Sequence, residues 1–313
     1  MQAILLRGFC FLSLAISTVS VFGQGQKITL EKKKDRVTVR LDDALFTEYI
    51  FDGYEKPILY PVIGPTGIPM TRDFPMKKGT PNEADDHPHH KSIWFGHMKV
   101  NDESFWHTGD DAGSTQQVAI QVVGDSIQTK NKLVSRSGEV IATDSRILSF
   151  GADDSARWID YQVTYHASES DLVFGDNKDG QMGIRMRPEL RIKGPVAKGR
   201  AINANGQRED NIWGKRAPWI DYWAEIDDAT VGIAVFDHPE NLRYPTWWHA
   251  RDYGLLSANP FGIHHFEEFD YAKAGDYRLP AGASLIFKHR FVFHRGDSKT
   301  ADIKSRYQAW LRQ

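Results

Sequence analysis

Cysteine is almost missing from this chain, because the single Cys10 lies within the first 23 residues. That segment has a positive charge at Arg7, a mostly apolar stretch over residues 8–21 and a small residue at Gly23, which is the pattern of a secretory signal peptide. Its removal predicts a mature chain, residues 24–313, that contains no cysteine. Disulfides, thiol nucleophiles, thiolate metal sites and redox motifs are therefore excluded from the predicted mature protein.

Tracts of one charge and further long apolar runs are also missing. The 39 Lys and Arg residues are scattered among 41 Asp and Glu residues, which leaves a net charge of −2. We therefore predict that the protein neither binds nucleic acid nor inserts into a membrane. No Gly-rich phosphate loop, His-Glu-x-x-His helix or Gly-x-Ser-x-Gly turn is present. We therefore expect a small molecule or a polysaccharide as the partner. The signal peptide predicts export to the periplasm, to the cell surface or into the medium.

Helical periodicity is scarce, whereas patterns typical of β-strands recur at short intervals. Apolar or β-branched runs between turn signals predict strands at residues 27–30, 36–41, 45–51, 92–100, 117–123, 126–134, 140–150, 157–166, 181–192, 220–226, 230–236 and 284–294. Only residues 299–312 predict a helix, with Ile303, Tyr307, Trp310 and Leu311 on one face. We therefore predict one all-β domain over the whole mature chain, a large antiparallel β-sandwich with a C-terminal helix.

Histidine is concentrated in one short segment. Five of the twelve histidines lie between His87 and His107, together with Trp94 and Trp106. Histidine can bind a metal ion, transfer a proton near neutral pH and hydrogen-bond to sugar hydroxyls. Packing alone explains such a cluster poorly, so the segment is the first candidate for a functional site.

The run Asp86–His90 allows three interpretations. If it is extended, His87 and His89 point to one side and His90 to the other. His87 and His89 would then begin a site for one divalent metal ion, with a third ligand from elsewhere in the chain. The same side chains could instead transfer protons or contact a sugar. In the third interpretation they cap a turn and bond to the backbone.

A second candidate segment runs from Tyr244 to His265. It combines aromatic, cationic and acidic side chains, namely Trp247, Trp248, His249, Arg251, Asp252, His264 and His265. Aromatic faces beside such groups are how proteins hold a sugar ring. The alternatives are an Arg–Asp pair that orients a loop and tryptophans that belong to the core.

The remaining candidates are an Arg–Asp pair and several carboxylates. Arg72 and Asp73 lie in residues 60–91, a stretch with six prolines. They either bind a ligand or form a structural pair that locks the loop, and the structural pair is slightly favoured. The carboxylates that could act as a general base are Glu189, Asp252, Glu267 and Glu268. No motif singles out one of them.

Three runs resemble a bacterial family of unknown function, DUF6807, which is often labelled "methane oxygenase PmoA". They are residues 64–75, the run 86–90 followed by Trp94 and Phe95, and residues 248–262, and the resemblance covers nearly the whole mature chain. The label implies an integral membrane subunit, which does not fit a chain with no apolar span after its signal peptide. Membership implies an exported protein of bacteria that degrade complex carbohydrate.

The β-rich pattern and the histidine-containing loops are also similar to the galactose-mutarotase-like supersandwich. This resemblance implies a cleft in which histidines and a carboxylate bind a sugar. It rests on fold class and histidine content, so no catalytic residue is carried over from it.

We therefore expect a carbohydrate-active enzyme, an epimerase, lyase or hydrolase, with a cleft built from residues 60–107 and 244–268. The candidates for acid–base catalysis are His87, His89, His249 and Asp252. The candidates for substrate binding are Arg72, Asp73, His90, Trp94, Trp106, Trp247, Trp248, Arg251 and His264. The alternatives are a metal-dependent sugar enzyme that uses His87 and His89, and a non-catalytic carbohydrate-binding protein.

Overall fold

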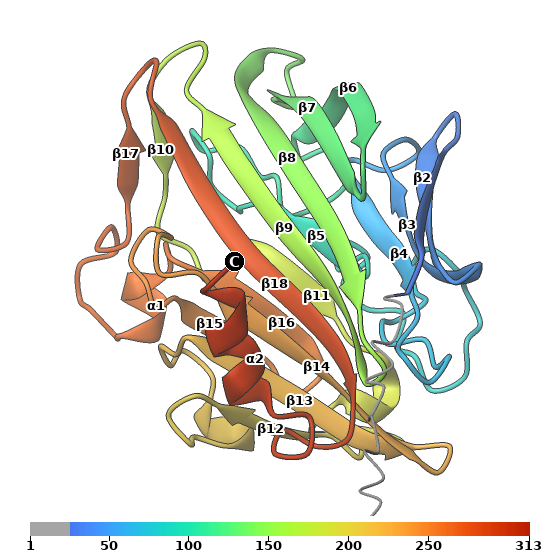
Figure 1. Ribbon diagram of the computed structural model, residues 1–313. Helices are drawn as coiled ribbons and strands as arrows, with labels where there is room; N and C mark the ends of the chain where they lie inside the picture. Colours follow the sequence, from blue (N-terminus) through green and yellow to red (C-terminus); the bar gives the residue numbers. More distant parts are fainter. Residues whose placement is uncertain (1–25) are drawn as a thin grey trace, which may run out of the picture.

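Two antiparallel sheets of eight strands each form the framework of the computed structural model, which describes residues 26–313 (Figure 1). The first sheet contains, in spatial order, β1 (Ile28–Lys32), β2 (Arg36–Leu41), β3 (Ala44–Ile50), β4 (Ile58–Val62), β5 (Ile93–Phe95), β11 (Met182–Arg185), β16 (Leu255–Asn259) and β15 (Trp247–Ala250). The second contains β12 (Arg200–Asn203), β13 (Trp219–Ile226), β14 (Ala229–Asp237), β18 (Ser284–Arg295), β9 (Ala156–His166), β8 (Val140–Ala152), β7 (Ser126–Val134) and β6 (Ser114–Val123).

The remaining elements are short. A two-stranded ribbon joins β10 (Leu172–Phe174) to β17 (Tyr277–Leu279). Two 3-10 turns occupy Pro188–Leu190 and Glu209–Asn211, and the α-helices are α1 (Ile263–Phe266) and α2 (Ile303–Trp310). The predicted all-β sandwich with a C-terminal helix is thus confirmed. The predicted signal peptide lies outside the described residues, and the assignment of residues 24–313 to one domain stays a prediction.

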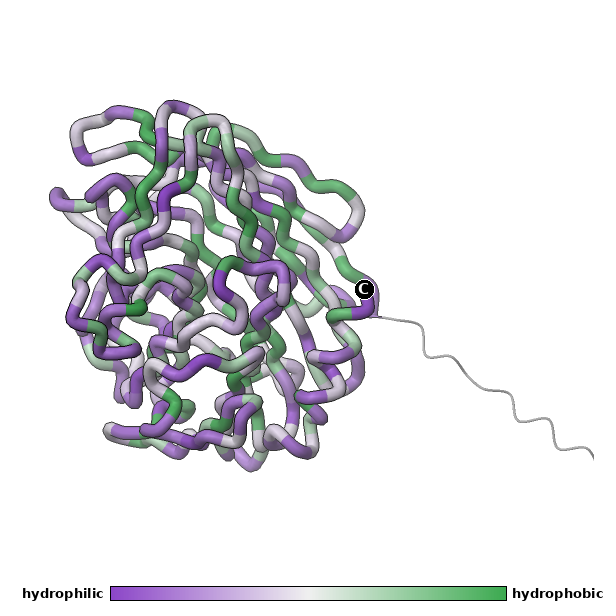
Figure 2. The backbone as a smooth tube through the Cα atoms, turned by 90° about the vertical axis from the view of Figure 1, so that its left-hand side faces the viewer, coloured by the Kyte–Doolittle hydropathy of each residue, from purple (hydrophilic) through white to green (hydrophobic). Residues whose placement is uncertain are grey.

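The two sheets pack face to face over a shared apolar core. Alternation along the strands produces this core, since Ile159, Tyr161 and Val163 of β9 are buried while the residues between them are partly exposed. Phe46 of the first sheet meets Phe293 of the second edge to face, with ring centroids 6.1 Å apart. In Figure 2 the apolar stretches run mainly along the strands, whereas the turns are mostly hydrophilic. Burial of each such phenylalanine contributes about 1.5–3 kcal/mol.

Helix α2 covers part of the outer face of the second sheet (Figure 1). Its buried Ile303 and Tyr307 pack on a small apolar cluster that comprises Ala156, Trp219, Ala234, Phe236, Val292 and Ala301. The face predicted for this helix is confirmed for these two residues. Leu311 follows the last helical residue and is 38% exposed, so its placement on that face was wrong.

The outer face of the first sheet is covered by irregular chain instead of a helix. A separate apolar cluster lies there, formed by Ile50, Ile58, Trp94, Trp106 and Leu255. The covering chain includes much of the proline-rich stretch 60–91 and the loop that follows β5. Strands β15 and β16 lie within the segment from Tyr244 to His265, where no strand was predicted from the sequence. No helix in residues 26–313 is long and apolar enough to cross a membrane.

Candidate functional site

A row of residues across four neighbouring strands forms the floor of the candidate site. Trp94 of β5 pairs with Gly183 of β11, Gly183 with Ser257 of β16, and Ser257 with His249 of β15. Directly paired residues project to the same side of a sheet, which here is the side facing away from the shared core. A Cβ atom on Gly183 would lie 2.6 Å from the Trp94 ring and 3.0 Å from the Trp106 ring. Glycine is therefore required for the two indoles to cover the strand.

Above this floor, four rings lie nearly parallel. The ring centroid of His90 is 5.2 Å from that of Trp94, and the ring of His87 lies 4.8 Å from that of His90. Tyr253 stacks on His87 at 5.3 Å with an interplanar angle of 12°. His90 is buried, whereas the His87 side chain is 41% exposed. The stack therefore brings together the two segments, 60–107 and 244–268, that were predicted to form one site.

The histidine run is a turn and not an extended strand. His87 has a positive φ of 45°, and the amide of His90 donates to the carbonyl of His87 at 2.9 Å. The turn places all three rings together, with His89 edge-on to His90 at 4.3 Å and to His107 at 4.6 Å. The expectation that His90 points away from His87 and His89 was therefore wrong, because it assumed extended backbone.

Arg185 of β11 fixes the orientation of the buried His90. Its guanidinium donates to His90 Nδ1 at 2.9 Å and to the Asp86 carboxylate at 3.0 Å, and lies 4.6 Å from the Tyr253 ring centroid. Because Nδ1 accepts this bond, the His90 proton is on Nε2. Burial holds the pKa of His90 well below its ordinary value. His90 is thus a neutral, oriented imidazole.

Arg72 and Asp73 hold the loop that carries the histidines. The buried Arg72 donates to the Asp86 carboxylate at 2.6 Å and also to backbone carbonyls of residues 84, 86, 87 and 90. Asp73 accepts bonds from the Tyr60 hydroxyl at 2.9 Å and the Thr80 hydroxyl at 2.7 Å. These contacts match the loop-lock alternative for both residues.

His249 faces a carboxylate that the sequence did not indicate. Asp179 Oδ1 lies 3.7 Å from His249 Nδ1, and Lys178 pairs with the same carboxylate at 3.0 Å. Burial lowers the pKa of His249 to about 4. Burial also disfavours ionisation of Asp179, but Lys178 and His249 hold the pKa of this carboxyl below its ordinary value. A neutral imidazole therefore faces an ionised carboxylate at neutral pH.

The two partly exposed imidazoles, His89 and His107, are neutral as well. Burial and the neighbouring His107 and Lys56 lower the pKa of His89 to about 3. Burial lowers the pKa of His107. Neutral imidazoles can accept a proton or share one hydrogen-bond donor and one acceptor with a ligand.

Several buried polar atoms on this side of the sheet lack a hydrogen-bond partner among the described residues. They are Trp94 Nε1, Trp106 Nε1, both amide atoms of Gln181, Arg185 Nε and His249 Nδ1. Gln181 lies two residues before Gly183, so it projects to the same side as Gly183 and Arg185. Buried polar groups normally have partners, and one unsatisfied group costs about 1–3 kcal/mol. Six of the eighteen such atoms in residues 26–313 therefore lie on this side of the first sheet.

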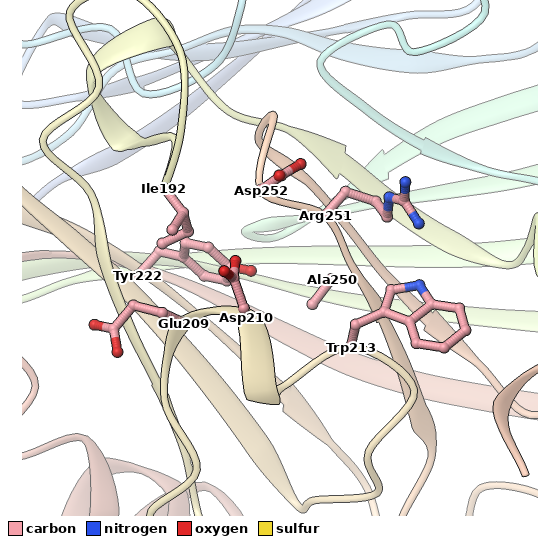
Figure 3. A pocket seen from close by; sticks show the side chains of 8 residues that line it. All are labelled: Ile192, Glu209, Asp210, Trp213, Tyr222, Ala250, Arg251 and Asp252. Carbon is pink, nitrogen blue, oxygen red and sulfur yellow. The ribbon is translucent and has the colours of Figure 1, made fainter.

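A hollow of about 210 Å³ adjoins the stacked rings at Arg251 (Figure 3). It is lined by Ile192, Glu209, Asp210, Trp213, Tyr222, Ala250, Arg251 and Asp252. Asp252 approaches Lys193 at 3.6 Å, and Figure 3 shows the Arg251 side chain turned away from Asp252. Arg251 lies 5.6 Å from the Tyr253 ring centroid and so connects the hollow with the stack. Asp252 lines the hollow, and the charged group that it approaches is Lys193 and not a histidine.

Three other predicted residues do not join the stack. Trp248 belongs to the shared core, where its indole donates to a backbone carbonyl at 2.9 Å. The Trp247 indole donates to Glu267 at 2.6 Å and is covered by Arg216. His264 lies on α1, where its amide donates to Asp176 at 2.8 Å. Trp94 and Trp106 are fully buried, so the accessible rings of the stack are His87 and Tyr253.

No metal-binding group of three side chains accompanies His87 and His89. Their ring centroids are 5.7 Å apart, and within residues 26–313 no group of three or more His, Asp and Glu side chains is arranged to hold a metal ion. The donor set for the metal-dependent alternative is therefore incomplete in the described part of the chain.

Sequence reasoning missed His107, Asp179 and Tyr253 as members of the site. Asp179 lies in a turn between strands, where nothing distinguishes it from other turn aspartates. Tyr253 lay in a motif that had been identified, but Trp247 and Trp248 were preferred there as sugar contacts. Only the pairing of β5, β11, β16 and β15 brings these residues to the histidines.

The fold and the site define an all-β sandwich protein with a histidine-rich polar site on the outer face of one sheet. The sequence of residues 36–308 matches DUF6807, described as a family of unknown function, and the chain belongs to this family. No curated protein matches the chain.

Several solved structures show a distant likeness. A galactose mutarotase related enzyme from Lactobacillus acidophilus is 10% identical over 86% of this chain and 97% of its own, with a TM-score of 0.33. A putative aldose 1-epimerase from Escherichia coli K12 is 12% identical over 87% and 99%, with a TM-score of 0.29. A galactose mutarotase-like protein from Lactobacillus casei is 10% identical over 86% and 100%, with a TM-score of 0.32.

Proposed function

We propose that this protein is a carbohydrate-active enzyme that acts on a sugar or glycoside by acid–base catalysis. One observation carries the proposal: neutral imidazoles, an ionised carboxylate and several buried polar atoms without partners lie on one side of the first sheet, where His87, Tyr253 and Asp179 reach solvent. A sugar offers many hydroxyl groups, each of which both donates and accepts a hydrogen bond. It is therefore a ligand class that satisfies such a mixed set of donors and acceptors.

His249 and Asp179 are the proposed catalytic pair. The imidazole takes a proton from the substrate and becomes an imidazolium, which the carboxylate 3.7 Å away stabilises. The reverse transfer returns a proton to the substrate. Epimerases, lyases and hydrolases all need such proton transfers, so the pair is compatible with each of these reactions.

His87 and Tyr253 are the proposed contacts to the sugar ring. Both are partly exposed and nearly parallel, so their faces are available to the CH groups of a pyranose. His89 and His107, which meet edge to face at 4.6 Å, are placed to hydrogen-bond to hydroxyls. Trp94 and Trp106 hold these rings from below.

Substitution of the proposed pair tests the proposal. His249→Gln and Asp179→Asn should abolish turnover in a screen of sugars and glycosides while saturable sugar binding persists. His166→Ala serves as the control, because His166 lies on β9 of the other sheet and bonds only to two serine hydroxyls. Unchanged turnover in the His249 and Asp179 variants would overturn the catalytic assignment.

Two further measurements separate the alternative functions. Saturable sugar binding without any product from the unsubstituted protein would identify a carbohydrate-binding protein. Stoichiometric metal in elemental analysis, lost in His87→Ala, would identify the metal-dependent enzyme.

Export belongs to the proposal too. If residues 1–23 are a signal peptide, intact-mass analysis of the protein from the periplasm or the medium should show a chain that begins at Gln24. A mass that includes the first 23 residues would contradict this assignment.

A further inference from the structure

Positive charge is concentrated around the stacked rings. The charged side chains that influence the ionisation of these rings are the cations Lys56, Arg72, Lys178, Arg185 and Arg251 and the carboxylates Asp86 and Asp179. Cations thus outnumber carboxylates around the stack, although the whole chain has a net charge of −2. The adjoining hollow adds Glu209, Asp210 and Asp252, of which Asp210 and Asp252 approach Lys193. The excess is a local property of the site, and such a local field favours ligands of the opposite sign.

The two carboxylates are already used by other cations. Asp86 accepts from both Arg72 at 2.6 Å and Arg185 at 3.0 Å. Asp179 pairs with Lys178 at 3.0 Å and faces His249. Neither carboxylate is left to neutralise Arg251.

Arg251 has no salt bridge and no side-chain hydrogen bond within residues 26–313. The carboxylate next to it in sequence, Asp252, approaches Lys193 instead at 3.6 Å. The Arg251 guanidinium lies over the face of Tyr253, at 5.6 Å from the ring centroid. Its five donors therefore remain available at the border between the stack and the hollow shown in Figure 3.

We propose that the substrate is an acidic saccharide whose carboxylate is bound by Arg251 while its sugar ring contacts Tyr253 and His87. This inference rests on the proposed function, since it assumes that the stack receives a saccharide. The planar guanidinium fork matches the two oxygens of a carboxylate and binds them in a bidentate manner. A uronic acid carries such a carboxylate directly on its ring, within reach of a cation at the edge of the stack.

Matched sugars test the charge preference. We would measure binding calorimetrically for the methyl glycosides of glucose, galactose and mannose, for the corresponding uronates and for the uronate methyl esters. Each set shares its ring stereochemistry, and only the uronate has a negative charge. In at least one set the uronate should bind about tenfold or more tightly than both the neutral sugar and the ester, and added salt should reduce the difference.

Substitution of Arg251 assigns the preference to this side chain. Arg251→Gln should remove it, and Arg251→Lys should retain part of it because the charge persists without the fork. Arg312→Gln is the control, since Arg312 is exposed after helix α2 and its loss removes the same charge far from the site. The variants should unfold at the same temperature as the unsubstituted protein.

The outcomes separate this inference from the proposed function. Equal affinity for uronates and neutral sugars, or a preference that survives Arg251→Gln, overturns the acidic substrate and leaves the sugar site standing. The absence of saturable binding by any of these sugars overturns the sugar site and the acidic substrate together.

Discussion

Two buried His–Asp pairs in this protein have opposite surroundings. His294 Nε2 lies 2.8 Å from Asp221 Oδ1 in the second sheet, and neither side chain has any exposed surface. His249 lies 3.7 Å from Asp179 in the first sheet, and the Asp179 side chain is 20% exposed. The ring of His294 leaves no space at Gly232, where a Cβ atom would lie 2.3 Å from it. The second-sheet pair is closed to ligands, whereas the first-sheet pair has an open side.

The comparison teaches that the residue types do not decide the role of such a pair. Both nitrogens of His294 have oxygen partners, since Nδ1 is 3.3 Å from the carbonyl of Arg295. Nδ1 of His249 has no hydrogen bond within the described chain. We therefore infer that one pair stabilises the fold and that the other is available for chemistry.

The largest expected effect is on stability, when the closed pair is broken. His294→Ala should lower the free energy of unfolding by about 3–5 kcal/mol, because it leaves the Asp221 carboxylate buried without its partner. Urea unfolding monitored by circular dichroism measures this. Asp179→Asn should change the same quantity by less than about 1 kcal/mol, since this carboxylate reaches solvent. A similar loss in both variants would contradict the distinction between the pairs.

The next effect is on turnover, when the open pair is altered. His249→Gln should reduce kcat about 10²- to 10⁴-fold, the usual contribution of a general acid or base. Steady-state kinetics on the substrate found in the screen measures this, with His166→Ala as the reference. A change in KM alone would assign His249 to substrate binding instead of proton transfer.

A smaller effect concerns a buried cation beneath the site. Lys56 donates to the carbonyls of Phe105, Trp106 and His107 at 3.2, 2.6 and 3.0 Å, and burial lowers its pKa to about 7. The unfolded chain keeps this proton up to about pH 10.4, so between these values the unfolded state binds more protons than the folded state. Stability should therefore rise from about pH 7 towards pH 10 through this group.

Lys56→Met isolates that contribution. As the pH is raised from 7 to 9.5, the unfolding free energy of the original protein should increase relative to that of the variant. Urea titrations at both pH values provide the measurement. A difference that stays constant with pH would show that Lys56 keeps its proton in the folded protein.

The smallest expected effect is that of mild acid on sugar binding. Burial lowers the pKa of His89 to about 3 and that of His249 to about 4, so both rings stay neutral when ordinary histidines begin to protonate. Measured in His87→Asn, which removes the exposed imidazole at a positive-φ position that asparagine tolerates, affinity should change less than about twofold between pH 8 and pH 5.5. Calorimetric titrations at several pH values test this, and a tenfold loss near pH 6.5 would mean that the rings ionise like exposed histidines.

Much of the fold was predictable because the strands of the second sheet have clear patterns. The long strands β7, β8, β9 and β18 each alternate or carry β-branched and aromatic runs, and their predicted positions agree with the structure. The central strands of the first sheet are short, and β5 has only the three residues Ile93–Phe95. A strand buried on both faces loses its alternation, so β16 had no recognisable period.

The site was predictable in its outline and not in its chemistry. Residue types singled out the histidine run and residues 244–265, and the structure brings His87 of the first segment to Tyr253 of the second. The roles of Trp94 and Trp106 depended on burial, which local sequence does not report for tryptophan. Asp252 stood out by its neighbours, yet its carboxylate is directed to the hollow beside the site.

The sequence by itself determined the all-β class, the C-terminal helix, the single cysteine at Cys10 and the two segments that meet at the candidate site. These properties follow from composition and from the local repeat of apolar residues in strands and helices. Only the tertiary structure decided that Asp179 and not Asp252 faces His249, that Arg251 has no counter-charge, and that His294 is closed to ligands. Such facts arise from strand pairing between residues far apart in the chain, where register and burial are set by packing of the whole sandwich.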